Sequence, residues 1–154
     1  MKKLVLFASV VLLFAGCSVF VRPPEQTARG GKVVCFLYKK TKFKNAVIQN
    51  VSETLSSQGF TVVRDNVRKS KYYSSADYGA VVYMAQYWQF HTPWHAKRYF
   101  NRNKESRNTL FVVTSGNPKI VIKKPFDAIT SASKKENIER VSKEITEKIG
   151  RILK

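Results

Sequence analysis

The fold is decided by residues 32–44, which read Lys32-Val33-Val34-Cys35-Phe36-Leu37-Tyr38 and then Lys39-Lys40-Thr41-Lys42-Phe43-Lys44. The first seven residues are almost continuously apolar, which is typical of a strand buried on both faces, as in a parallel sheet. After the polar stretch, Ala46, Val47, Val51 and Leu55 recur at helical spacing, and Gly59 stands where a helix cap belongs. Strand, loop and helix in this order predict the start of an α/β sheet.

The rest of the chain continues this alternation. Further strands are predicted at Phe60–Val63, Ala80–Ala85 and Thr109–Thr114. Thr92-Pro93 is typical of a helix start. Ser133-Lys134-Lys135-Glu136 reads as a capping box before a last helix, whose apolar stripe is Ile138, Val141, Ile145, Ile149 and Ile152. Together these elements predict an open α/β sandwich with a mainly parallel sheet.

At this point residues 32–154 resemble a flavodoxin-like domain. Residues 38–44 occupy the place of the flavodoxin phosphate loop, Asp77–Tyr83 with Tyr87-Trp88 resemble the third strand and its aromatic loop, and Leu110–Pro118 resemble the fourth strand and the flavin-side loop. The resemblance implies an FMN site beyond the carboxyl ends of the strands, at the topological switch point. The residues that it would assign to the cofactor are Lys39, Thr41, Lys42, Lys44, Tyr87, Trp88, Thr114, Ser115, Gly116 and Asn117.

The phosphate loop departs from the family. The family's loop is rich in Ser, Thr and Gly, because hydroxyl and backbone N–H groups wrap a phosphate at a helix N-terminus. Here only Thr41 survives, Lys42 stands where glycine is expected, and Lys39 and Lys44 replace hydroxyl residues. Either the loop grips phosphate by charge, or the fold has lost its flavin and kept its shape.

The chain also reads as a shortened member of the family after the fourth strand. Only a short linker precedes Ile120-Val121-Ile122, whereas a parallel crossover needs about a dozen residues or more. Residues 119–123 are therefore interpreted as a hairpin arm or as a strand joined without the usual helix. Residues 126–130 resemble the segment before the last helix of some flavodoxin-like proteins.

No catalytic set or metal site stands out. Tyr83, Tyr87, Trp88, Phe90, Trp94 and Tyr99 form an aromatic cluster that would either stack on a flavin ring, through Tyr87 and Trp88, or pack a loop and a helix face. His91 and His95 lie four residues apart, but a helix boundary falls between them, so surface histidines are favoured over metal ligands. Cys35 is interpreted as a buried thiol of the core.

The N-terminus predicts export and lipid anchoring. Lys2 and Lys3 precede an apolar run too short to span a bilayer, and Leu13-Phe14-Ala15-Gly16-Cys17 resembles the lipobox of bacterial lipoproteins. Residues 1–16 are then the signal peptide, Cys17 carries the lipid, and residues 17–31 are a flexible tether. The alternative is an ordinary secretory signal. Ser18 after the cysteine favours the outer membrane, facing the periplasm, where the host has one.

The charge indicates anionic partners. The chain has 28 basic and 10 acidic residues, and without Lys2 and Lys3 the 26 remaining basic residues leave a net charge of +16. Anionic lipid beside the anchor accounts for most of this, and export argues against nucleic acid. The sequence therefore predicts a membrane-anchored envelope lipoprotein with a non-enzymatic binding or structural role. The alternative is an FMN-binding electron-transfer or quinone-reducing domain with a redox partner.

Overall fold

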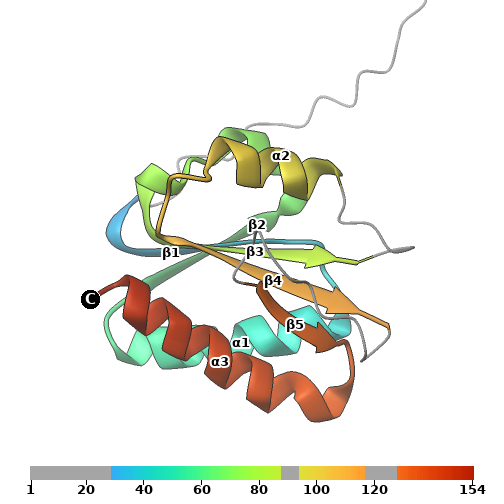
Figure 1. The fold of residues 1–154 in the computed structure, drawn as a ribbon. Coiled ribbons are helices and arrows are strands. Elements are labelled where there is room, and N and C mark those ends of the chain that lie inside the picture. The colour runs from blue at the N-terminus through green and yellow to red at the C-terminus, as the bar shows by residue number, and fades with distance from the viewer. Residues whose placement is uncertain (1–28, 88–93, 117–127) are drawn as a thin grey trace, which may run out of the picture.

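The sheet grows from β1 (Gly30–Tyr38), which lies between β2 (Thr61–Asn66) and β3 (Tyr78–Gln86). The computed structural model describes residues 29–87, 94–116 and 128–154. In them β4 (Thr109–Ser115) and β5 (Ala128–Ala132) extend the sheet beyond β3, giving the order β2-β1-β3-β4-β5 (Figure 1). All four neighbouring pairs are parallel. This is the strand order of flavodoxin-like folds, and it confirms the predicted fold class.

Helices cover both faces of the sheet, so the molecule has three layers (Figure 1). Helices α1 (Lys42–Ser57) and α3 (Ile138–Ile152) lie together on one face. The other face carries α2 (Trp94–Arg102) and the 3₁₀ helix η1 (Val67–Tyr72). Two further 3₁₀ turns, η2 (Ser75–Asp77) and η3 (Lys135–Asn137), precede β3 and α3.

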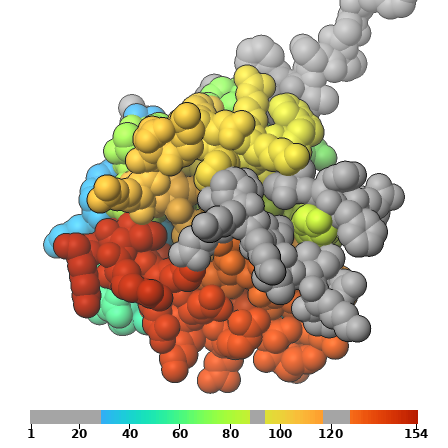
Figure 2. Space-filling model, viewed as in Figure 1, coloured from blue at the N-terminus to red at the C-terminus, as the bar shows by residue number. Residues whose placement is uncertain are grey.

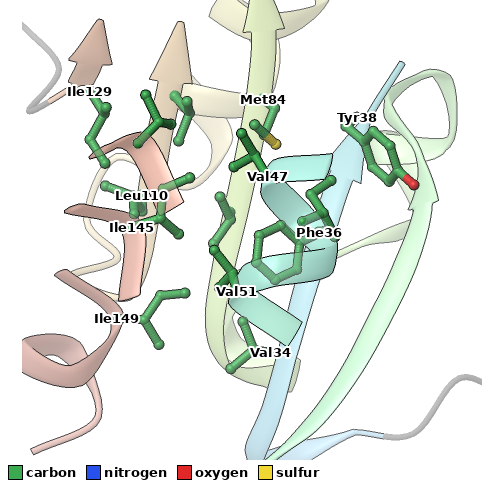
Figure 3. Close-up of a cluster of buried hydrophobic side chains, with 14 of the residues drawn as sticks. Val34, Phe36, Tyr38, Val47, Val51, Met84, Leu110, Ile129, Ile145 and Ile149 are labelled. Atoms are coloured by element: carbon green, nitrogen blue, oxygen red, sulfur yellow. The ribbon is translucent and has the colours of Figure 1, made fainter. Parts of the chain in front are cut away.

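Each face of the sheet has its own core, because successive strand residues point to opposite faces. The core under α1 and α3 contains Val34, Phe36, Met84, Leu110 and Ile145, among others (Figure 3). The opposite core uses the intervening residues Cys35, Tyr83 and Phe111, and it is completed by Tyr99 of α2. Cys35 is a free, fully buried thiol, as predicted.

The end of α1 is formed as the sequence predicts. Gly59 has a φ of +81°, the left-handed conformation that a helix C-terminal glycine adopts. Its N–H donates to the carbonyl of Ser56 (3.0 Å), and the N–H of Phe60 donates to that of Leu55 (3.0 Å). These two bonds make a Schellman motif, and Phe60 packs against the same core as Leu55. The chain is thereby turned directly into β2.

The predicted capping box of the last helix is wrong. Helix α3 begins at Ile138, after η3, and the side chain of Asn137 at its N-cap makes no capping bond. Ser133 instead donates its N–H to the carbonyl of Ser115 (3.0 Å), beyond the last paired residues of β4 and β5. Ser133, which the sequence pattern predicts as the helix N-cap, therefore extends the backbone hydrogen bonding between β4 and β5 by one residue.

The start of the fold differs in detail from the sequence interpretation, and its fifth strand agrees with it. Strand β1 begins at Gly30, two residues before the predicted start, and Arg29 pairs with Asp77 at 3.8 Å. The segment 126–130 is expected to precede the last helix, and in its described part β5 begins at Ala128 and leads through η3 into α3, which agrees with that expectation. The proposed arm at 119–123 lies outside the described residues, as does Cys17. No helix among the described ranges has the length and apolarity needed to cross a membrane.

Candidate functional site

The predicted cofactor loops meet at the carboxyl edge of the sheet. Strands β1 and β3 run in parallel, with Tyr38 opposite Met84. Strand β4 follows, with Thr114 opposite Gln86. The chain leaves β1 toward β2 and leaves β3 toward β4, so the strand order reverses between β1 and β3. That reversal is the topological switch point at which doubly wound sheets bind ligands.

The loop between β1 and α1 is short, because only Lys39, Lys40 and Thr41 separate the strand from the helix. Thr41 is the N-cap residue: it has extended backbone angles, and its hydroxyl oxygen accepts the N–H of Lys44 (3.2 Å). A capping oxygen satisfies one of the N–H groups that a helix leaves open at its start. The oxygen of Thr41 thus caps the helix, and Lys39 and Lys42 are exposed beside it.

Lys44 lies buried at the switch point. It is only 2% exposed, and its Nζ donates to the carbonyl oxygen of Met84, near the end of β3, at 3.1 Å. Among the described residues its ammonium pairs with no carboxylate. Burial, and secondarily the Lys39 cation, lower the pKa of Lys44 to about 8. The side chain therefore ties the first turn of α1 to β3 and does not extend into solvent.

The ends of β3 and β4 are joined by hydrogen bonds. Tyr87 donates its N–H to the carbonyl of Thr114 (2.8 Å), and the Thr114 hydroxyl donates to the carbonyl of Ala85 (3.2 Å). Thr114 and Ser115 are both almost fully buried, whereas Tyr87 is half-buried and Gly116 is exposed. The structure thus brings these predicted residues to one edge. Trp88 and Asn117 lie outside the described residues.

These groups do not build a flavodoxin-type phosphate cradle. Such a cradle needs hydroxyl and backbone N–H groups turned toward the anion at the helix start. The loop has a single hydroxyl, that of Thr41, whose oxygen caps α1 and which has only its own proton left to donate. The hydroxyl of Thr114 donates to a strand carbonyl, and the ammonium of Lys44 donates to the Met84 carbonyl beneath the helix. What remains at this helix start are the exposed lysines and the first N–H groups of α1. The donor set does not fit FMN phosphate held in the family's way.

The aromatic cluster divides between core and surface. Tyr83 stacks on Tyr99, with ring centroids 4.9 Å apart, and both lie in the core beneath α2. Trp94, at the start of α2 as described, is 70% exposed. The packing interpretation therefore holds for Tyr83 and Tyr99. Within the described ranges, no group of three or more His, Cys, Asp or Glu side chains could hold a metal ion.

A second feature was missed in the sequence. Arg68 and Lys71 of η1 and Arg98 and Arg102 of α2 line one hollow on the face opposite α1. Their spacings of three and four residues are those of neighbouring side chains on a helix surface, and this was the available signal. The scattered appearance of the basic residues in sequence concealed it, because two separate elements contribute to the hollow.

Comparison with known proteins rests on structure. No family model matches the chain, and no curated protein matches it. Among solved structures, the flavodiiron protein of Giardia intestinalis aligns with a TM-score of 0.55 at 13% identity, over 81% of this chain and 37% of its own. Rubredoxin oxygen:oxidoreductase from Desulfovibrio gigas aligns with a TM-score of 0.51 at 13% identity, over 81% and 36%.

The chain thus spans little more than a third of the length of these proteins. Oxidised flavodoxin 2 from Bacillus cereus is matched over nearly its whole length: the alignment covers 77% of this chain and 97% of that one, with a TM-score of 0.52 at 8% identity. At such identities a structural likeness carries the fold alone. The fold of this protein is flavodoxin-like.

Proposed function

We propose that this protein is a lipid-anchored envelope protein that uses a flavodoxin-like scaffold for binding, without a resident flavin and without catalysis. The observation that carries the proposal is the bond from Lys44 Nζ to the Met84 carbonyl. In the flavodoxin-like reading this residue is part of the phosphate loop, but its side chain is used to hold α1 on the sheet. The topological switch point is present, but the Lys44 ammonium and the Thr41 oxygen at it are hydrogen-bonded within the domain.

Flavin titration tests the absence of a cofactor. The chain is prepared without residues 1–17; among the described residues, those of both cores begin at Val33. FMN is added while flavin fluorescence and the visible spectrum are recorded, and circular dichroism shows that the sample is folded. We expect no saturable quenching up to about 100 μM FMN. Tight, quenched binding would overturn the proposal.

FMN binding is the second candidate function, and one observation favours it. Tyr87 and Thr114 are hydrogen-bonded neighbours, so the two loops that the resemblance assigns to the flavin ring begin side by side. The cofactor would supply the redox chemistry and the protein its position. If FMN binds, the combined change Thr41→Ala, Trp88→Ala and Asn117→Ala should abolish binding. Binding that survives this change would place the flavin elsewhere.

The lipid anchor rests on the sequence around Cys17 and has its own test. Cells expressing the full chain are labelled with a fatty-acid analogue, and the protein is followed into the membrane fraction. The label and the membrane association should disappear in Cys17→Ser and persist in Cys35→Ser, which changes the buried thiol of β1. Equal labelling of the wild type and Cys17→Ser would contradict the anchor.

A further inference from the structure

A hollow of about 400 Å³ opens between η1 and α2, on the face of the sheet opposite α1 and α3. Figure 2 shows α2 forming the upper part of the molecular surface in the view of Figure 1, with α3 forming the lower part. The volume suits a small ligand or a headgroup. The residues around it are Arg68, Ser70, Lys71, Trp94, His95, Arg98, Tyr99 and Arg102.

Arg102 holds the two walls of the hollow together. Arg102 donates to three backbone carbonyls of the opposite wall, at Ser70 (2.5 Å), Tyr73 (2.8 Å) and Lys71 (3.0 Å). Its guanidinium also lies 5.4 Å from the centre of the Tyr99 ring. These bonds hold α2 against η1, so the two elements that form the walls of the hollow keep their spacing without a ligand. A site that is already ordered loses less entropy on binding.

The hollow is positive and has no acidic member. Two cations come from each wall, and none of them pairs with a carboxylate in the part of the chain that the structure describes. Asp65, near the end of β2 and just before η1, pairs with Lys69 at 3.3 Å and accepts the hydroxyl of Tyr73 at 2.5 Å. Burial, and secondarily the nearby Arg68 cation, lower the pKa of His95, because both disfavour the charged form of the imidazole.

Two aromatic residues complete the hollow. Tyr99 is 2% exposed, and its hydroxyl has no hydrogen-bond partner among the described residues, although a buried hydroxyl normally has one. Trp94 stands exposed at the rim, with its ring 6.3 Å from that of His95. An exposed tryptophan beside arginines is a common arrangement where a protein meets the headgroup layer of a membrane.

We propose that this hollow binds a phosphate-bearing anion, held by Arg68, Lys71 and Arg98. Guanidinium groups present paired N–H donors that match phosphate oxygens, and the uncompensated charge favours a multiply charged ligand. Such a phosphate could be the headgroup of an anionic lipid or a soluble compound. The inference goes beyond the proposed function and does not depend on the anchor at Cys17 or on the absence of a flavin.

Binding is measured on the chain without residues 1–17 and with Trp88→Phe, which leaves Trp94 as the single fluorescent tryptophan. One arm titrates vesicles of phosphatidylglycerol and phosphatidylcholine against vesicles of phosphatidylcholine alone. The other arm titrates pyrophosphate at constant ionic strength. A saturable change of Trp94 fluorescence is expected in at least one arm: the vesicle arm alone assigns a lipid headgroup, and the pyrophosphate arm assigns a soluble phosphate.

Two double charge reversals distinguish binding in the hollow from attraction by the positive charge of the whole domain. Arg68→Glu with Arg98→Glu should weaken binding about tenfold or more. Lys135→Glu with Lys143→Glu, which removes the same charge near α3, should have a much smaller effect. All four side chains belong to exposed residues, and the milder pair Arg68→Gln with Arg98→Gln serves if the first pair unfolds. Equal losses in the two reversal pairs, or no saturable signal from either probe, would overturn the inference.

Discussion

At the scale of single residues, the buried ammonium of Lys44 is the most consequential group in this fold. Removing a cation from water costs several kcal/mol, and one carbonyl oxygen does not replace a hydration shell. The four-carbon stem still contributes to the core, because it lies between α1 and β3. Lys44 therefore orders the switch point and at the same time lowers the stability of the folded state near neutral pH.

This cost predicts a pH-dependent effect of Lys44→Met. Because the folded pKa is about 8 and lies below the unfolded value, the unfolded state binds more protons above pH 8, and stability rises with pH there. The variant lacks this rise. We expect Lys44→Met to be more stable than the wild type at pH 7, with its advantage shrinking by about 2 kcal/mol between pH 7 and pH 9.5.

Urea unfolding at a series of pH values measures this difference. Subtraction of the variant from the wild type is needed, because burial raises the pKa of Cys35 and so acts in the opposite direction in both proteins. The control is Lys42→Met, two residues earlier and exposed, which should change stability little at any pH. An advantage of Lys44→Met that stays constant over this pH range would contradict the assigned pKa.

At the scale of elements, the sequence predicted the strands and helices that are marked by apolar runs or by apolar residues at regular spacing. Apolar runs located β1, β3 and β4, and helical spacing located α1 and α3. These patterns are set by burial on one or both faces, which a single sequence displays directly. The capping box failed because the local motif competed with a tertiary bond, from Ser133 to the carbonyl of Ser115. Such a competition is decided by the assembled sheet.

The candidate site was predictable only in position. The order of the elements placed its loops at one edge, and the structure confirms this for Thr41, Tyr87 and Thr114. The bond that each side chain makes was not predictable. Helical spacing puts Lys44 on the buried face of α1, three, four and seven residues before Val47, Ile48 and Val51, and leaves Lys42 off that face. It does not show that the Lys44 ammonium bonds to the Met84 carbonyl. The basic hollow was missed for a related reason, since it exists only when η1 and α2 meet.

The crossover between β2 and β3 uses two 3₁₀ turns, and the amide of Asn103, directly after α2, bonds to the second of them, η2. Asn103 is buried; its side-chain oxygen accepts the N–H (3.1 Å) and the hydroxyl (2.8 Å) of Ser75, and its nitrogen donates to the carbonyl of Tyr99 (2.8 Å). Asn103→Ala leaves the buried groups of Ser75 without partners. We expect a loss of about 2–3 kcal/mol in the free energy of unfolding.

Chemical denaturation of Asn103→Ala provides the measurement, with Asn101→Ala as its partner. Asn101 lies in α2 two residues before Asn103 and is exposed, so its replacement by alanine removes no buried bond. Alanine also has the higher helix propensity, and this control should be neutral or slightly stabilising. Similar losses in the two variants would show that the amide of Asn103 does not hold η2.

At the scale of the whole molecule, the two faces of the sheet have separate tasks. One face packs against α1 and α3 through a core that is mostly aliphatic (Figure 3), and the other packs the aromatic rings of Tyr83, Tyr99 and Phe111 beneath α2 and η1. The basic hollow lies on the second face, whereas the predicted cofactor site lies at the strand ends. A ligand in the hollow would therefore leave the switch point free, and the two candidate sites can be tested independently.

The rate at which the Cys35 thiol reacts tests whether the domain unfolds as one cooperative unit. It is fully buried in β1, which lies between β2 and β3, and burial raises its pKa, so no thiolate is available in the folded state. Without residues 1–17 it is the only cysteine. We expect a thiol reagent to leave the native protein unmodified and to react at once in concentrated urea.

At intermediate urea concentrations, the reaction rate of Cys35 should track the free energy of global unfolding, because a central strand is exposed only when both of its neighbours separate from it. A cysteine placed at the exposed Ser57, in a Cys35→Ser background, supplies the control, and it should react quickly without urea. If native Cys35 reacted nearly as fast as that control, β1 would open locally. The two cores could then not form a single cooperative unit, since residues on both faces of β1 belong to them.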